Sequence, residues 1–297
     1  MGFGALLFRL INTVREMNMG YKTILSILDT QKTAQQVTDF SIALAEQYGS
    51  HVIGLHCEAV AGIPMMAPME MPDPVAVQAM QDLAEKETAK IAEIFSHASQ
   101  REGISSEWRS IATSVGSTDF LIDSGRCADL LVVAQGDSGA LSEGRSEMEA
   151  ALFESGRPVL LVPYILKTPK PIKRVLIAWN GSREASRATF DALPFLKQAE
   201  AVEVFSVVED HNEKTSKIIT AAEIATTLAR HGVNITVTQE EKGELAAAAH
   251  IENRLSDAGI DLLVMGAYSH KRWWEVLFGG VTRTVLDSMT ALTLLSR

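Results

Sequence analysis

Residues 172–196, IKRVLIAWNGSREASRATFDALPFL, follow the same pattern as a stretch of equal length near the start of the chain. That earlier stretch is YKTILSILDTQKTAQQVTDFSIALA, residues 21–45. Each has a short apolar run, a polar turn and an amphipathic segment, which is typical of a buried strand that leads into a helix. Asp29 and Asn180 follow the two apolar runs at equivalent places. The chain therefore contains an internal repeat.

The two copies also end alike. ADLLVVAQG at 128–136 matches IDLLVMGAY at 260–268, and RPVLLVPY at 157–164 matches TALTLLSR at 290–297. Each copy is predicted to run strand, helix, strand, long helix, strand, strand, helix, strand. The strands of the first copy are expected near Thr23–Leu28, Val52–His56, Ser106–Ile111, Leu130–Ala134 and Val159–Val162. Those of the second are expected near Arg174–Ala178, Val202–Val207, Asn234–Glu240, Leu262–Met265 and Leu292–Leu295.

The predicted fold class is α/β, with two tandem doubly wound domains. Apolar Val, Ile and Leu runs that alternate with helices indicate parallel strands covered on both faces. We therefore expect a five-stranded parallel sheet with helices on both faces in each domain. Residues 1–19 form an N-terminal extension outside the repeat, residues 20–166 the first domain, and residues 167–297 the second. The lysine- and proline-rich stretch Leu166–Lys173 is interpreted as the linker.

The long helix of the first copy is expected over Val75–His97, after a loop rich in Met and Pro. Its apolar residues recur at helical spacing, so they are predicted to share one face. These residues are Ala76, Met80, Leu83, Ile91, Ile94, Phe95 and Ala98.

Composition excludes several classes of protein. The formal net charge of −10 disfavours general nucleic-acid binding, which needs a basic surface. No apolar run is long enough to span a bilayer, so no stable membrane insertion is expected. The two cysteines, Cys57 and Cys127, are too few for a disulfide framework, which favours a cytoplasmic location.

At RVLIAWNGSREASRA (174–188) and DLLVMGAYSHKRWWEVLFGGVTRTVL (261–286) the chain resembles the universal stress protein family in its tandem two-domain form. The resemblance covers nearly everything from residue 21 to residue 297. It implies a Rossmann-like sandwich of the adenine-nucleotide α-hydrolase type. Members of the family either bind ATP or have lost it. Those that bind it carry Gly-x2-Gly-x9-Gly-Ser/Thr after the fourth strand and an acidic residue at the end of the first.

The second copy is similar to this pattern. Gly266 fits the first glycine, Ser269 stands in place of the second, and Gly279 fits the third. Gly280 replaces the hydroxyl residue, although Thr282 follows closely. In the first copy Ala134 replaces the first glycine, and the loop that follows carries Glu143, Glu147 and Glu149. Asp29 is the acidic residue, but it lies in that poorer copy, so each copy keeps one part of the family's site.

Phosphate binding at Gly279 and Gly280 has a physical basis. The start of a helix offers unpaired N–H groups and the positive end of its dipole, and glycines let the backbone approach the ligand closely. Lys271, Arg272 and Arg283 could add positive charge. The alternative is a tight glycine turn before the last helix. The residues expected to contact ATP or a related adenine nucleotide are Asn180, Gly266, Ser269, Gly279, Gly280, Val281 and Thr282.

Asn180 has two readings: it could hydrogen-bond a ribose hydroxyl, or Asn-Gly-Ser could be a turn in which Ser182 caps the next helix. His56 is interpreted as core or rim filling at a strand end. No catalytic or metal-ligand motif is present, so we expect no enzyme, although a slow ATPase would need few specialised residues. The sequence favours a stress-response binding module, with a non-nucleotide-binding interaction and dimerisation protein as the alternative. A homo-oligomer is expected in either case.

Overall fold

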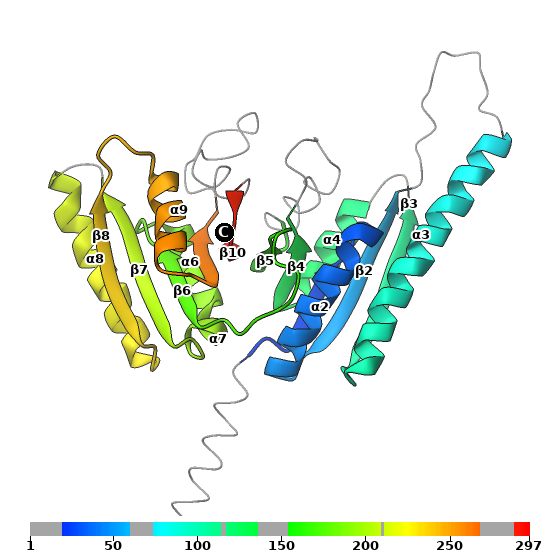
Figure 1. Ribbon diagram of the computed structural model, residues 1–297, viewed down its shortest axis with the longest axis horizontal. Helices are drawn as coiled ribbons and strands as arrows, with labels where there is room; N and C mark the ends of the chain where they lie inside the picture. The colour runs from blue at the N-terminus through cyan, green and yellow to red at the C-terminus, as the bar shows by residue number, and fades with distance from the viewer. Residues whose placement is uncertain (1–19, 60–73, 114–116, 136–153, 209–210, 268–287) are drawn as a thin grey trace, which may run out of the picture.

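The computed structural model describes residues 20–59, 74–113, 117–135, 154–208, 211–267 and 288–297. Its strands form one ten-stranded sheet in the order β3-β2-β1-β4-β5-β10-β9-β6-β7-β8. The two halves of the chain lie on either side of the central pair β5 and β10 (Figure 1). The strands are β1 Thr23–Ile27, β2 His51–Ala59, β3 Ser106–Thr113, β4 Leu130–Ala134, β5 Val159–Val162, β6 Arg174–Ala178, β7 Ala201–Val208, β8 Ile235–Glu241, β9 Leu262–Gly266 and β10 Leu292–Ser296.

Helices cover both faces of this sheet. They are α2 Gln31–Tyr48, α3 Pro74–Arg101, α4 Ser117–Arg126, α6 Arg183–Asp191, α7 Leu193–Leu196, α8 His211–Arg230 and α9 Ala247–Asp257. One apolar core holds buried side chains of α2, α3, α6, α7 and α8, and a second core on the opposite face holds those of α4 and α9. The predicted doubly wound α/β class is therefore confirmed.

Both halves use the same strand order. Within each half the strands lie in the order third, second, first, fourth, fifth. All strands of one half are parallel. Small contacts repeat as well. The Asp129 carboxylate accepts from the backbone N–H of Lys22 and Thr23, and the Asp261 carboxylate accepts from Lys173 and Arg174. The predicted repeat is thus visible in strand order and in individual hydrogen bonds.

The two halves join through an antiparallel pair whose register is symmetric. Leu160 of β5 lies opposite Leu294 of β10. Thr293 lies opposite Leu161, and Leu295 lies opposite Val159. Because Leu160 and Leu294 hold equivalent places in the two copies, a pseudo-two-fold axis passes between them. This pairing leaves β3 and β8 as the two outer edges of the sheet.

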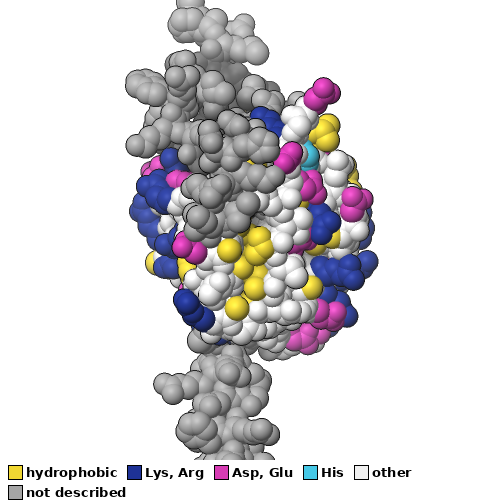
Figure 2. Space-filling view, turned by 90° about the vertical axis from the view of Figure 1, so that its left-hand side faces the viewer, with side chains coloured by type: hydrophobic (Ala, Val, Ile, Leu, Met, Phe, Trp, Pro, Cys, Tyr) yellow, Lys and Arg dark blue, Asp and Glu magenta, His cyan; other side chains and the backbone are white. Residues whose placement is uncertain are grey.

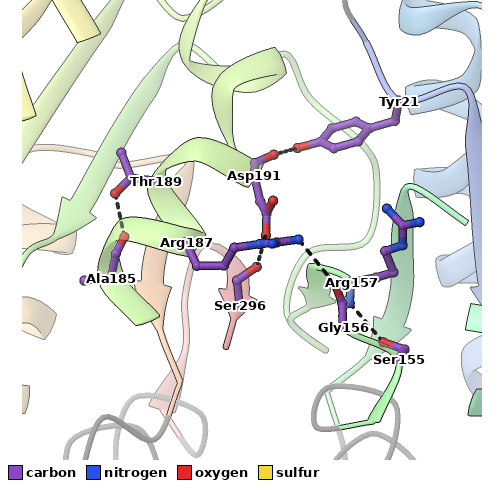
Figure 3. A network of polar contacts seen from close by, with 9 residues as sticks. All are labelled: Tyr21, Ser155, Gly156, Arg157, Ala185, Arg187, Thr189, Asp191 and Ser296. Atoms are coloured by element: carbon purple, nitrogen blue, oxygen red, sulfur yellow. Dashed lines mark hydrogen bonds and ion pairs between the residues drawn. The ribbon is translucent and has the colours of Figure 1, made fainter. Parts of the chain in front are cut away.

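Polar and aromatic contacts reinforce this junction (Figure 3). The Tyr21 hydroxyl donates to the Asp191 carbonyl at 2.7 Å, and the Tyr21 ring lies 5.2 Å from that of Phe195. Burial first, and then the neighbouring Tyr48 and Asp191, raise the pKa of Tyr21 well above its ordinary value. Arg187 pairs with the Asp191 carboxylate at 2.8 Å and donates to a carbonyl of the first half, that of Gly156, at 3.4 Å. The residues just before β1 and β5 of the first half are therefore fixed to α6, the first helix of the second half.

The predicted order of elements was wrong at one point in each half. A helix separates the third and fourth strands, α4 in the first half and α9 in the second, where two successive strands had been expected. Parallel strands need a crossover connection, so a helix is required there. Both helices are short, with ten residues in α4 and eleven in α9, so each shows only about three turns of helical pattern. The helix expected between the fourth and fifth strands falls outside the described residues.

The predicted core face of the long helix was only partly right. Ile91, Phe95 and Ala98 are buried, but Met80 is 58% and Leu83 is 69% exposed. At about 1.5 Å per residue the 28-residue α3 is about 42 Å long, whereas the nine-residue β2 spans only about 30 Å. The first turns of α3 therefore extend beyond the sheet, as Figure 1 shows.

Candidate functional site

The strand order places a candidate ligand site between β6 and β9. From β6 the chain continues outward to β7 and β8, then returns to β9 on the other side of β6, so the two strands flank a topological switch point. Ligands of open α/β sheets bind at the carboxyl ends of such strands. Asn180 follows the end of β6 and Gly266 ends β9, so both predicted residues lie at this edge. Ser269, Gly279, Gly280, Val281 and Thr282 fall outside the described residues.

Asn180 belongs to a tight turn that starts α6. Its side-chain oxygen accepts from the backbone N–H of Ser182 at 3.0 Å, and Gly181 between them has φ +74°. The Ser182 hydroxyl in turn accepts from the N–H of Ala185 at 3.1 Å and so caps the helix. The turn reading of this stretch is therefore confirmed. A ribose contact by Asn180 remains a prediction.

Gly266 has a packing role at the same edge. A Cβ built on it would lie 2.4 Å from the Ala185 nitrogen and 2.5 Å from the Glu184 carbonyl carbon. Both are backbone atoms in the first turn of α6, so no side-chain rotation could relieve the clash. Glycine at this position thus lets β9 and the start of α6 approach closely. Ala134 takes the equivalent place at the end of β4, where the first copy tolerates a methyl group.

A carboxylate already lies at the start of α6. Glu184 is 7% exposed, and its carboxylate pairs with Arg183 at 2.9 Å. Burial alone would raise the pKa of Glu184, but its own backbone N–H, Arg183 and Ser182 together lower that pKa below its ordinary value. The positive dipole end of α6 is therefore already paired with a carboxylate of the chain, that of Glu184. A phosphate group would need a different helix start.

Three buried polar groups lie near this edge without a hydrogen-bond partner. Within the part of the chain that the structure describes, these are Trp179 Nε1, Ser206 Oγ and Gln239 Nε2. Trp179 directly follows β6, and Ser206 lies opposite Gln239 on β7 and β8. By strand alternation all three side chains point to the sheet face that α6 and α8 cover. Buried polar atoms without partners are rare in folded proteins, and the described residues supply none for these three.

The first half has no such cluster at the equivalent place. Leu28 stands where the second half has Trp179, and His56 stands where it has Ser206. The buried His56 Nδ1 donates to the Leu28 carbonyl at 2.6 Å, so His56 fills the strand end as predicted. The partnerless hydroxyls described in this half, such as Ser26 in mid-strand and Tyr48 in α2, lie elsewhere. The two halves thus differ at this place in whether their buried polar atoms have hydrogen-bond partners.

The cluster was missed in the sequence. Trp179 lies within an apolar run and reads as core, and neither Ser206 nor Gln239 belongs to a motif. A signal was nevertheless present: an indole N–H next to Asn180 at the end of a buried strand needs a partner.

Two features are absent from the described residues: a helix that could cross a membrane and a cluster of side chains that could hold a metal ion. No helix among the residues that the structure describes is long and apolar enough to cross a bilayer. The same residues contain no group of three or more His, Cys, Asp or Glu side chains that could hold a metal ion.

Comparison with known proteins identifies the fold. A universal stress protein from Archaeoglobus fulgidus DSM 4304 has a TM-score of 0.67 at 15% identity, over 92% of this chain and 96% of that one. A protein of Pseudomonas aeruginosa UCBPP-PA14, provisionally assigned to the universal stress proteins, has a TM-score of 0.59 at 16% identity, over 94% of each chain. A functionally unknown protein of Pseudomonas aeruginosa PAO1 has a TM-score of 0.58 at 16% identity, over 94% of this chain and 93% of that one.

No protein-family model matches the chain, and no curated protein matches it by sequence. At these identities the structural matches establish the fold alone. The chain has the tandem two-domain fold of the universal stress proteins, which confirms the resemblance predicted from its sequence.

Proposed function

We propose that the protein is a stress-response binding module that holds ATP or a related adenine nucleotide in its second half. The nucleotide lies at the carboxyl ends of β6 and β9, with its phosphates on the backbone of Gly279, Gly280 and Val281 and with Thr282 assisting. Asn180 faces the ribose. This placement follows the general rule for open α/β sheets and the affinity of helix N-termini for phosphate.

The observation that carries the proposal is the cluster of Trp179, Ser206 and Gln239. Their polar atoms are buried without partners and extend from the end of β6, at the switch point, to Ser206 on β7 and Gln239 on β8. A nucleotide base offers both donors and acceptors on its edges, so it could satisfy an indole N–H, a hydroxyl and an amide at once. Because Glu184 already occupies the N-terminus of α6, the helix start that the sequence predicts at Gly279 and Gly280 is the proposed phosphate position.

The first experiment is mass spectrometry of small molecules released when the purified chain is denatured. The second is calorimetric titration of ATP, ADP and AMP into the chain and into two variants. Trp179→Phe keeps an aromatic side chain but replaces the indole by a smaller phenyl ring without Nε1–H, and should weaken binding at least about fivefold, since one hydrogen bond contributes about 1 kcal/mol. Tyr48→Phe is the matched control, because it also removes a buried polar atom without a partner, but in α2 of the first half.

The proposal requires heat of binding in the parent chain, a loss in Trp179→Phe and no change in Tyr48→Phe. Absence of binding heat for all three nucleotides, together with no released nucleotide, would refute the proposal. The alternative, a non-nucleotide-binding interaction and dimerisation protein, would then be favoured. Equal affinity of Trp179→Phe and the parent would place the nucleotide away from the cluster.

A further inference from the structure

The outer edge of the sheet at β8 differs from the edge at β3. β8 reads ITVTQEE, and its first five residues carry no charge and no proline. β3 reads SEWRSIAT and carries Glu107 and Arg109, which pair with one another at its middle. Charged side chains and proline are the usual means by which proteins protect an open strand edge from pairing. The middle of β8 lacks both.

The backbone of β8 directs N–H and C=O groups that can form hydrogen bonds toward the open side of the sheet. The Asn234 carbonyl accepts from Val202 of β7 at 2.9 Å, and the N–H of Lys242 donates to Val208 of β7 at 2.9 Å. Even-numbered residues of β8 therefore bond inward to β7. The alternate residues Ile235, Val237 and Gln239 direct their N–H and C=O groups outward. No other strand of the described ranges pairs with this side, because β8 ends the sheet.

The exposed surface over this edge is apolar at its centre. Val237 is 45% exposed although it lies at the middle of a strand. Figure 2, which faces this side of the molecule, shows hydrophobic side chains gathered near the centre and charged side chains toward the rim. An apolar centre with a polar rim is the usual anatomy of a protein interface.

We propose that the β8 edge binds the β8 edge of a second copy of this chain, antiparallel about a two-fold axis at Val237. In that register Val237 faces its own counterpart, and Ile235 faces Gln239. Thr236 faces Thr238, a favourable cross-strand pair. Each outward residue then exchanges its N–H and C=O with an outward residue of the partner.

The sequence of β8 is what makes a second copy the occupant. Thr236-Val237-Thr238 reads the same in both directions, and the residues beyond it, Ile235 and Gln239, are both uncharged. Glu240 and Glu241, at the end of the strand, face Asn234 and Val233 of the other copy, so no like charges meet. The chain already joins its own halves by a symmetric antiparallel pair, β5 with β10. The proposal does not depend on nucleotide binding.

The test is sedimentation velocity of the full chain over a concentration series. Edge pairing of one strand makes a small interface, so a dissociation constant on the order of micromolar is expected. Val237→Lys places two ammonium groups opposite each other on the axis and should shift the chain to monomer, with a loss of affinity of at least tenfold. Ser110→Lys, on the exposed outer edge of β3, is the matched control and should leave the dimer unchanged.

A cross-link tests the register. Val237→Cys in a Cys127→Ser background should form a disulfide-linked dimer on oxidation, because opposed residues of a hydrogen-bonded antiparallel pair have Cα atoms about 5.5 Å apart. Ser110→Cys in the same background should not. A monomeric parent chain, a Val237→Lys variant that still dimerises, or cross-linking at residue 110 but not 237 would each overturn the proposal. Equal association with an unrelated polypeptide that bears no matching strand would also overturn it.

Discussion

The first and second halves share one strand order but differ in what they bury at equivalent positions. In the first half, Ile53 of β2 packs in an apolar cluster with Leu121 of α4. The equivalent residue of β7 is Glu203, which is 8% exposed and pairs with Arg254 of α9 at 2.9 Å. The switch points differ in the same sense, because Leu28 and His56 are replaced by Trp179 and Ser206. At these equivalent positions the first half therefore buries an apolar contact and a hydrogen-bonded histidine, whereas the second buries an ion pair and polar atoms without partners.

The largest expected effect concerns the buried ion pair. Arg254→Leu leaves the Glu203 carboxylate, whose side chain is 10% exposed, without its partner and should destabilise the protein by about 3–5 kcal/mol. The double variant Glu203→Ile with Arg254→Leu copies the first half and should recover most of that loss, since apolar replacements of buried pairs are often neutral. Urea unfolding monitored by circular dichroism measures both. If the double variant is no more stable than the single one, the second half cannot accept the apolar pair of the first half in place of its ion pair.

A smaller effect is expected at the ends of the fourth strands. Gly266→Ala drives a methyl group into the backbone of α6 and should cost about 1–3 kcal/mol. The reciprocal change, Ala134→Gly, removes one buried methyl group and adds chain entropy without a backbone clash, and should cost about 1 kcal/mol. Thermal melting of the two variants, scanned side by side, compares them. If Ala134→Gly proved the more damaging, the close approach of β9 and α6 would not be what requires glycine.

The smallest effect is a pH dependence at the β8–α9 turn. His250 places Nδ1 2.8 Å from the Glu240 carboxylate and Nε2 2.8 Å from the Lys242 carbonyl. The Lys242 carbonyl first, and then Glu240, raise the pKa of His250 above its ordinary value, against the effect of burial. A raised folded-state pKa means that the protonated form is the stabilising one.

The stability from His250 is therefore fully present below about pH 6.5, the unfolded value, and is lost as pH rises through the higher folded pKa. The loss should not exceed about 1 kcal/mol, the contribution of one hydrogen bond. Relative to His250→Gln, the parent chain should lose unfolding free energy across this window. Parallel stability curves for the two proteins from pH 6 to 9 would contradict this role.

Much of the fold could be predicted because apolar runs report buried parallel strands directly. All ten strands were located, and the repeat between residues 21–45 and 172–196 gave the two-copy architecture. The helices α4 and α9 were missed, since each spans only about three turns. Met80 and Leu83 were assigned to the core because periodicity shows which face a residue occupies, but not where the sheet beneath it ends.

The candidate site could be predicted only in part, because some of its residues come together only through the register of neighbouring strands. Asn180 and Gly266 lie at the switch point because parallel strands bring their carboxyl ends to one edge. The sequence suggested a ligand role for Gly266, whereas the structure shows that packing against α6 already requires glycine there. Trp179, Ser206 and Gln239 become a group only through strand register, which no local motif records.

The most direct test of the contrast between the halves is the stoichiometry of nucleotide binding. Calorimetric titration of ATP into the intact chain and into Gly279→Val counts the occupied sites. One nucleotide is expected per intact chain and none in the variant, because a branched side chain would stand where the backbone must approach phosphate. Two nucleotides per chain, or one that persists in Gly279→Val, would contradict a single site in the second half.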